Sequence, residues 1–251
     1  MSGHSKWATI KRKKGATDAK RGAVFTKFGK EIAIAAREGG PDPDSNFKLR
    51  LVVDKAKAVN MPKENIERAI RRGAGLEKSD ALEEVMYEGY GPHGVAFLVQ
   101  VVTDNRNRAL ADIRRQFNRL GGSLGEAGSV AWMFEQKGYI AIEPGPTNPD
   151  DIFNVAVEYG ADDVVFGDDL VEVYTAPGDL NVVRTALAGR GMGIDSVELT
   201  MVPKTTVALE DKQAFQNMNL IDGLEDLDDV QAVYTNLDMP DELMARYEEE
   251  A

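Results

Sequence analysis

Cysteine is absent from this chain of 251 residues, which excludes disulfide bonds and thiolate ligands for a metal. His4 and His93 are the only histidines, neither lies in a ligand spacing, and a zinc ion would need carboxylates to complete its shell. The longest apolar run, residues 95–102, is interrupted by Gln100 and is far short of the roughly 20 residues that cross a bilayer. We therefore expect no metal site and no membrane anchor. In the absence of a secretory signal pattern we expect a cytoplasmic protein.

Acidic residues are scarce only at the start of the chain. Lys and Arg number 18 against 8 Asp and Glu in residues 1–75, but 12 against 34 from residue 76 onward, and the net charge is -12. Half of the cations in the first segment lie before residue 31, where Asp18 is the single acid: Lys6, Lys11, Arg12, Lys13, Lys14, Lys20, Arg21, Lys27 and Lys30. Most of the surface would repel a polyanion, and one end would hold it. The asymmetry predicts docking on nucleic acid in one orientation.

Residues 1–75 predict a basic arm followed by three helices. The first helix is expected to be capped by Thr17 or Asp18 and to end near residues 39–41, where the sequence reads GGP. A second helix is expected from Ser45. A third opens with Pro62 in its first turn and stops at Gly73. This segment therefore predicts a small helical bundle.

From residue 84 the apolar pattern alternates, as in β-strands. Residues 85–90 and 95–103 predict a hairpin around the turn at 91–94, followed by a helix that ends at Gly121 and a strand at 129–134. Residues 138–203 predict the order βαββαβ, the ferredoxin-like unit. A helix at 211–224 and a strand at 230–235 are too little to fold alone, so we expect them to complete the sheet begun at residue 84. The acidic tail past residue 239 is expected to fray.

The fold class predicted is therefore α+β with three domains. The first is the basic N-terminal helical bundle, residues 1–77. The second is a discontinuous domain of helices and strands, residues 78–136 and 205–240, and the third is the inserted ferredoxin-like domain, residues 137–204. An acidic tail, residues 241–251, follows.

The arm is the main candidate binding element. Residues 11–14 are four consecutive cations with no acid within three residues, which argues against ion pairing along a helix and favours phosphate contact. Trp7 offers a face for stacking on an unpaired base, although core packing is the more common role of tryptophan. The nine cations named above and Trp7 form the first part of the candidate site.

A second cluster of cations follows residue 104. Five of the twelve cations after residue 75 lie in residues 106–119, and Arg106 and Arg108 open this run. Guanidinium groups match the geometry of phosphate. Pairing with Asp104 or Asp112 on a solvated face is an equally good interpretation, and both stay open. Arg106 and Arg108 complete the candidate site.

Other motifs carry less chemistry. The glycine-rich segments 121–128 and 189–193 run into strands and lack the residues of a phosphate-binding loop or a dinucleotide fingerprint, so we expect no nucleotide cofactor and no small-molecule substrate. His93 could form an acid–base pair with Glu88, but turn geometry is the simpler reason for its position. The sequence suggests no catalytic nucleophile.

Several of these segments resemble the YebC family, which includes the mitochondrial translational activator of cytochrome c oxidase subunit one. The matching segments are GHSKWATIKRKK at 3–14, DAKRG at 18–22, FTKFGKEI at 25–32, AIRRGAG at 69–75, YEGYGP at 87–92, TDNRNR at 103–108 and GGSLGEAGSVAWMF at 121–134. The resemblance covers nearly the whole chain and implies three domains with a ferredoxin-like insertion.

The resemblance implies two functions. Members are described as DNA-binding transcriptional regulators, and others resemble ribosome-associated factors that help translation past difficult sequences such as proline runs. An acidic body with one basic arm suits insertion into folded RNA, and no groove-reading module is recognisable in the sequence. We therefore place ribosomal RNA ahead of DNA as the partner. An enzyme acting on RNA is a third alternative, and the oligomeric state is left open.

Overall fold

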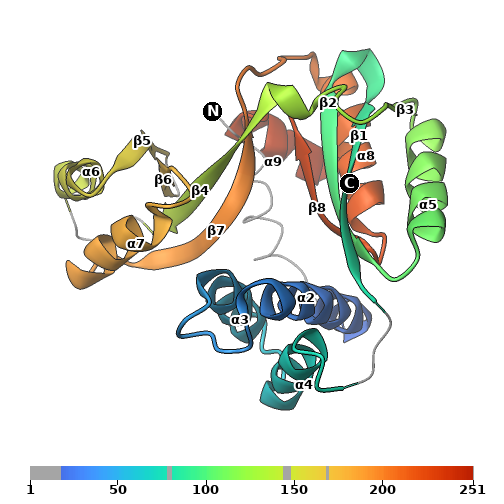
Figure 1. The fold of residues 1–251 in the computed structure, drawn as a ribbon. Helices are drawn as coiled ribbons and strands as arrows, with labels where there is room; N and C mark the ends of the chain where they lie inside the picture. Colours follow the sequence, from blue (N-terminus) through green and yellow to red (C-terminus); the bar gives the residue numbers. More distant parts are fainter. Residues whose placement is uncertain (1–17, 78–80, 144–147, 168–169, 251) are drawn as a thin grey trace. The chain divides into compact units, whose positions relative to one another are not determined.

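The computed structural model describes residues 18–77, 81–143, 148–167 and 170–250 (Figure 1). The chain forms two compact units. One contains the chain up to Phe134 together with the residues from Pro203 onward, and the other is Glu135–Val202. The fold is α+β, as predicted, with a four-stranded sheet in each unit.

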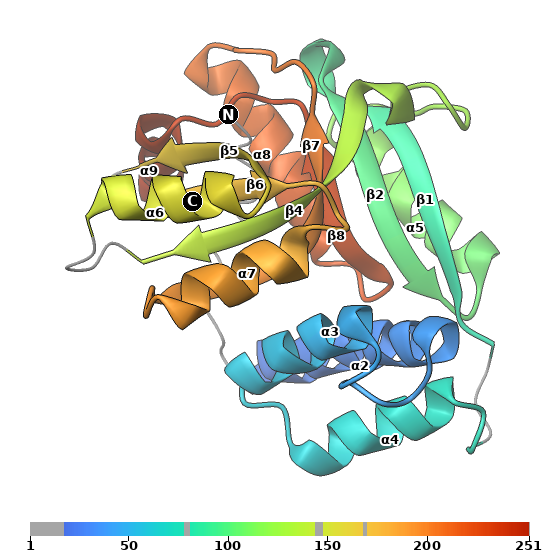
Figure 2. The same cartoon turned by 60° about the vertical axis from the view of Figure 1, so that its left-hand side comes forward.

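The first part of the larger unit is a bundle of three helices, seen in Figures 1 and 2: α2 (Asp18–Gly39), α3 (Phe47–Ala58) and α4 (Lys63–Gly73). The α3 helix begins slightly later than Ser45 suggested, because the side chain of Asn46 accepts a hydrogen bond from the backbone N–H of Leu49 and caps it. Ile32, Leu49 and Ile66 meet in the bundle core. The predicted helical bundle is confirmed.

The second part of this unit is a sheet in the order β3-β1-β2-β8. Strands β1 (Glu83–Tyr90) and β2 (Ala96–Thr103) form the predicted antiparallel hairpin, and β2 pairs with β8 (Val230–Thr235), more than a hundred residues later. The short β3 (Ser123–Leu124) pairs with β1. The expectation that the last strand completes the sheet begun at residue 84 is thus confirmed.

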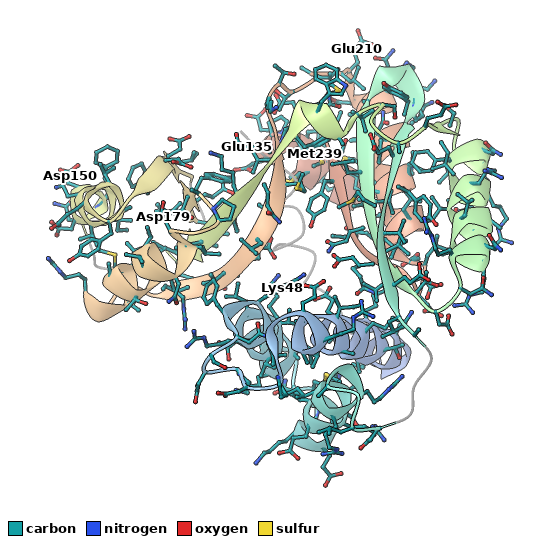
Figure 3. All side chains as sticks on the ribbon, in the orientation of Figure 1. Lys48, Glu135, Asp150, Asp179, Glu210 and Met239 are labelled. Atoms are coloured by element: carbon teal, nitrogen blue, oxygen red, sulfur yellow. The ribbon has the colours of Figure 1, made fainter. Side chains whose placement is uncertain are left out.

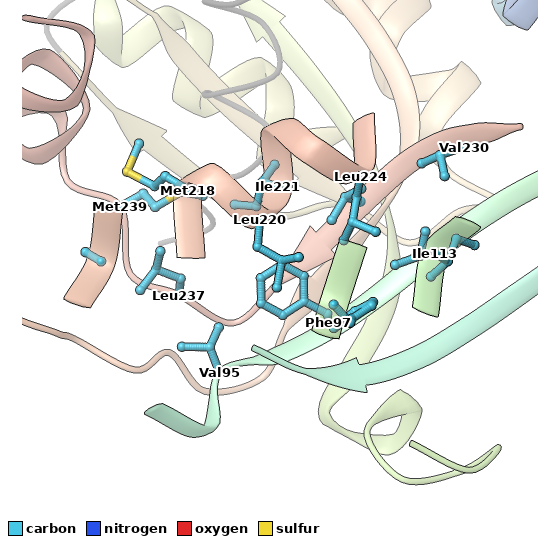
Figure 4. Close-up of a cluster of buried hydrophobic side chains, with 14 of the residues drawn as sticks. Val95, Phe97, Ile113, Met218, Leu220, Ile221, Leu224, Val230, Leu237 and Met239 are labelled. Carbon is cyan, nitrogen blue, oxygen red and sulfur yellow. The ribbon is translucent and has the colours of Figure 1, made fainter. Parts of the chain in front are cut away.

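Alternate residues of β2 place one face of this sheet in the core. Val95, just before β2, together with Phe97, Val99 and Val101 of that strand, is fully buried and belongs to the same cluster as residues of α5 (Arg106–Arg119) and α8 (Asp211–Glu225) (Figure 4). The rings of Phe97 and Phe117 meet edge to face at 5.8 Å. The core of the larger unit is therefore built from segments on both sides of the insertion.

The smaller unit contains most of β4 (Phe134–Ile142), then α6 (Pro149–Glu158), β5 (Ala161–Phe166), β6 (Val171–Thr175), α7 (Leu180–Gly189) and most of β7 (Ile194–Pro203). Its strand order, β5-β6-β4-β7, places the first and third strands of the unit at the centre. This is the ferredoxin-like arrangement, as predicted.

Two expectations about the elements were wrong. Residues 129–133 form no strand, and β4 begins only at Phe134: the 3-10 turn η2 (Ala131–Met133) precedes it, because the carboxylate of Glu88 accepts hydrogen bonds from the backbone N–H groups of Gly128, Val130 and Ala131. The C-terminal segment is not frayed. It forms α9 (Asp241–Glu250), which buries Leu243, Met244 and Tyr247 in the core of the larger unit. These three residues recur at helical spacing between the acidic residues, so the segment has an apolar face that packs on the core.

Candidate nucleic-acid interface

The structure describes half of the predicted binding residues. Lys6, Trp7, Lys11, Arg12, Lys13 and Lys14 lie outside the described residues. Lys20, Arg21, Lys27 and Lys30 lie on α2, and Arg106 and Arg108 occupy the first turn of α5. The described candidates therefore come from two elements that are distant in sequence but belong to one compact unit.

Lys27 and Lys30 of α2 bond to residues between the end of α8 and the start of β8. The Lys27 ammonium donates to the carbonyl oxygen of Glu225 at 2.5 Å, and the Lys30 ammonium lies 2.5 Å from an Asp229 carboxylate oxygen. Burial lowers the pKa of Lys27, and the nearby carboxylate of Glu225 acts in the opposite direction. Both lysines therefore connect α2 to residues 225–229, which run from the last residue of α8 to the residue before β8.

Asp229 connects three elements of the unit. Besides Lys30, its carboxylate accepts hydrogen bonds from the Thr103 hydroxyl at 2.9 Å and from the Arg108 guanidinium at 3.1 Å. Burial would raise the pKa of Asp229, but these three hydrogen bonds outweigh it, and the pKa is lowered. Asp229 therefore remains a carboxylate that fixes the end of β2, the start of α5 and the middle of α2.

Some arginines of α5 form close ion pairs, and others are largely exposed to solvent. Arg108 also lies 2.6 Å from Asp104, and Arg115 lies 2.7 Å from Asp112, which are the pairings expected of a solvated face. Arg106 is 60% exposed, and its contact with Glu83 is long, at 3.8 Å. In Figure 3, nitrogen-tipped side chains project outward along α5. Of the two predicted residues, Arg106 has the greater freedom to contact a partner.

Two further cations, Arg68 and Arg72 of α4, were missed by the sequence reasoning. Both are exposed, and both line a hollow of about 500 Å³ between α2, α4 and the start of α5, together with Lys30 and Arg108. Their spacing of four residues, which places them on one face of a helix, was the available signal. In the sequence, the segment around Arg72 stands out only through its resemblance to the YebC family.

Trp132, the tryptophan in the described part of the chain, has 67% of its surface accessible. Its ring N–H donates to the carbonyl oxygen of Ser129, in the loop that Glu88 organises. Burial would raise the pKa of Glu88, but three backbone N–H donors outweigh this and lower it.

His93 does not form an acid–base pair with Glu88. Its backbone has a φ of 63°, and its ring nitrogen lies 2.9 Å from the side-chain oxygen of Gln216, so turn geometry accounts for its position. The Glu88 carboxylate instead accepts hydrogen bonds from backbone N–H groups of the loop before β4.

No group of acids and histidines in the described parts of the chain is arranged to hold a metal ion. Among the described helices, none combines the length and the apolar character needed to cross a bilayer.

Comparison with known proteins identifies the family. Residues 5–76 match the profile of the TACO1/YebC protein N-terminal domain, and residues 82–237 match that of the TACO1/YebC second and third domain. The chain belongs to the TACO1/YebC family. Residues 77–81, between the helical bundle and the first sheet, separate the two matches.

Relatives in the TACO1/YebC family match over almost their entire length. A protein of Syntrophobacter fumaroxidans is 56% identical over 98% of this chain and 99% of its own, and one of Trichlorobacter lovleyi is 54% identical over 95% and 96%. Both are named probable transcriptional regulatory proteins. The crystal structure of a conserved hypothetical protein from Aquifex aeolicus superposes with a TM-score of 0.81 at 42% identity, covering 89% of this chain and 93% of that one.

Proposed function

We propose that the protein is a non-enzymatic, nucleic-acid-binding regulator of gene expression in the cytoplasm. It acts through its basic N-terminal arm, assisted by Arg106 and Arg108, on ribosomal RNA, and it helps translation past difficult sequences such as proline runs. The observation that carries the proposal is the concentration of positive charge: 18 Lys and Arg against 8 acids in residues 1–75 of a chain whose net charge is -12.

The charge distribution favours folded RNA over a DNA duplex. From residue 76 onward acids outnumber cations by 34 to 12, so a long straight duplex would bring the acidic remainder near phosphates that repel it. Folded RNA presents phosphates on several sides of a narrow space and unpaired bases that stack on side chains. A basic arm enters such a space while the acidic remainder stays outside.

The second candidate is a DNA-binding transcriptional regulator. The printed names of the relatives from Syntrophobacter fumaroxidans and Trichlorobacter lovleyi favour it. Several arms presented together by an oligomer would supply the duplex affinity that one arm lacks. A regulator of this kind would bind a defined promoter.

Co-sedimentation separates the two candidates. We expect the protein in a cell lysate to travel with ribosomes rather than with nucleoid DNA, and purified translation of a proline-run message to respond to it without transcription. A footprint at one promoter, with a response in purified transcription and none in translation, would establish the DNA candidate instead.

We predict that residues 11–14 dominate affinity. Replacing Lys11, Arg12, Lys13 and Lys14 by Ala removes four cations, so binding to every nucleic acid should weaken, and the salt slope should fall by about 0.7 to 0.9 for each phosphate that the variant no longer binds. Fluorescence anisotropy at several salt concentrations measures both.

The matched control removes the same amount of charge elsewhere. It replaces four other exposed cations by Ala: Lys57, Lys63, Arg190 and Lys212. This variant should keep the wild-type salt slope. Equal slopes for the arm variant and the wild type would show that residues 11–14 touch no phosphate.

A further inference from the structure

The hollow between α2 and α4 is bounded by two helix faces of the same geometry. The α2 face presents residues 22, 25, 26 and 29, and the α4 face presents residues 65, 68, 69 and 72, each at the i, i+3, i+4, i+7 spacing of one helical stripe. Leu82, Asp104 and Arg108 also line the hollow, which is called the cleft below. Its volume of about 500 Å³ lies within the roughly 300–1,000 Å³ typical of ligand sites.

Two glycines keep this cleft open. A Cβ atom placed at Gly22 or Gly29 would meet no other heavy atom within 4 Å, so the surrounding fold does not require glycine there. Glycine inside a helix costs about 1 kcal/mol relative to alanine. Glycine at these two positions therefore leaves space along the cleft at the expense of helix stability.

The lining of the cleft combines cations with apolar side chains. Four cations line the cleft in the described part of the chain, Lys30, Arg68, Arg72 and Arg108, together with the carboxylate of Asp104. Lys30 and Arg108 are already paired with Asp229, which leaves Arg68 and Arg72 as the candidate phosphate ligands. The Arg68 guanidinium is oriented by the side-chain oxygen of Asn65 at 2.6 Å, and in the described part of the chain Arg72 makes no ion pair. The apolar lining residues are Phe25, Met61, Ala69 and Leu82.

We propose that this cleft binds one unpaired nucleotide of an RNA strand, an inference that rests on the proposed function and locates part of the RNA on the described surface. The guanidinium groups of Arg68 and Arg72 receive the phosphate, because their planar donors match its oxygens. The base lies against the half-buried ring of Phe25. A base held in a duplex is stacked on its neighbours and does not reach the Phe25 ring.

The test compares neighbouring arginines of α4 in the full-length protein. Arg72→Gln should weaken binding to a labelled single-stranded RNA dodecamer about tenfold, the effect of removing one charge-assisted hydrogen bond, and lower the salt slope by about 0.7. Arg71→Gln removes the same charge from the same helix, but Arg71 lies 2.7 Å from Glu77 and does not line the cleft, so binding should stay within about twofold of wild type.

A third variant fills the cleft without changing its charge. Gly29→Leu adds a side chain where the structure has space, so it should weaken single-strand binding several-fold while leaving the melting temperature unchanged or raised. Circular dichroism checks that melting temperature. Arg72→Gln tests the loss of a charge in the cleft, Arg71→Gln tests the loss of the same charge outside it, and Gly29→Leu tests the loss of space in the cleft.

The outcomes distinguish the cleft from the proposed function. If wild type binds RNA but Arg72→Gln and Arg71→Gln weaken it equally, or Gly29→Leu binds as tightly as wild type, the cleft is not a nucleotide site and the proposed function stands. An equal weakening on a matched RNA duplex would also overturn the cleft, since it indicates general charge. A wild-type protein that binds neither the dodecamer nor ribosomes would contradict both.

Discussion

Two largely buried carboxylates, those of Glu88 and Asp229, each hold segments of the larger unit in place through hydrogen bonds. Glu88, with 8% of its surface exposed, accepts hydrogen bonds from the backbone N–H groups of Gly128, Val130 and Ala131 at 2.6, 2.7 and 2.7 Å. Together these donors fix a loop that carries the exposed Trp132. One residue of β1 thereby determines the conformation of a segment some forty positions later.

We predict that Glu88→Gln lowers the free energy of unfolding by about 1.5–3 kcal/mol at pH 7, because the amide is uncharged and accepts through one oxygen only, while its NH2 group cannot accept from the remaining backbone N–H donors. The pKa of Glu88 is lowered in the folded protein, so its contribution is present above the unfolded value of about 4.3 and disappears as the pH falls through the folded value. Urea unfolding at pH 7 and at successively lower pH should show the gap between variant and wild type closing. A gap independent of pH would contradict this role.

Lys30 is predicted to act on stability rather than on nucleic-acid affinity. Its side chain is 17% exposed and that of Asp229 is 12% exposed, so Lys30→Ala leaves a largely buried carboxylate with fewer partners and should cost about 1–3 kcal/mol. The destabilisation should shrink below pH about 3.9, because the pKa of Asp229 is lowered in the folded protein.

The control for Lys30 is Lys57→Ala, which breaks an exposed pair with Asp54 and should change stability by less than about 0.5 kcal/mol. Urea unfolding measures both variants. If the Lys30→Ala protein is as stable as wild type but has a smaller salt slope for RNA binding, Lys30 binds phosphate and the prediction is wrong.

At the scale of elements, local patterns were sufficient for most helices and strands. Pro62 before α4 and Asn148 before α6 are start signals that depend on neighbouring residues alone. The strand expected at 129–134 begins only at Phe134. Its alternating apolar pattern is present, since Val130 and Phe134 are buried, but the backbone N–H groups of Val130 and Ala131 donate to the Glu88 carboxylate. A side chain from another element therefore overrode the local pattern.

The α9 helix is predicted to be part of the core rather than a tail. Leu243→Ala should lower the free energy of unfolding by about 2–5 kcal/mol, because Leu243 is 4% exposed among buried residues of α8 and β8. Arg246→Ala, in the same helix, removes a 49% exposed side chain paired with Asp211 and should cost less than about 1 kcal/mol. Similar small effects from both would mean that α9 does not pack on the core.

At the scale of the whole molecule, one unit interrupts the other. The larger unit draws its core from residues on both sides of the insertion, and β2 pairs with β8 across it. We propose that the domains are divided as the sequence indicated, with residues 137–204 inserted into 78–136 and 205–240. The compact unit Glu135–Val202 begins and ends two residues earlier.

We predict that the segment 135–202 folds alone, because it contains a complete ferredoxin-like layer of four strands and two helices. Expressed by itself, it should melt cooperatively in circular dichroism and calorimetry. Residues 205–240 expressed alone should not, since β8 would lack β2 as a partner. A non-cooperative melt of 135–202 would refute the domain assignment.

Sequence alone determined the helices of the bundle, the hairpin, the ferredoxin-like order and the basic start of the chain. Periodicity, caps and charge counts depend on residues near one another, so they are readable without a fold. Tertiary structure decided which cations are available. Lys30 meets Asp229, 199 positions away, whereas Arg72 lines a cleft and makes no ion pair in the described part of the chain. Ion pairing depends on distance in space, and only the packing of α2, α4 and the α8–β8 turn sets that distance.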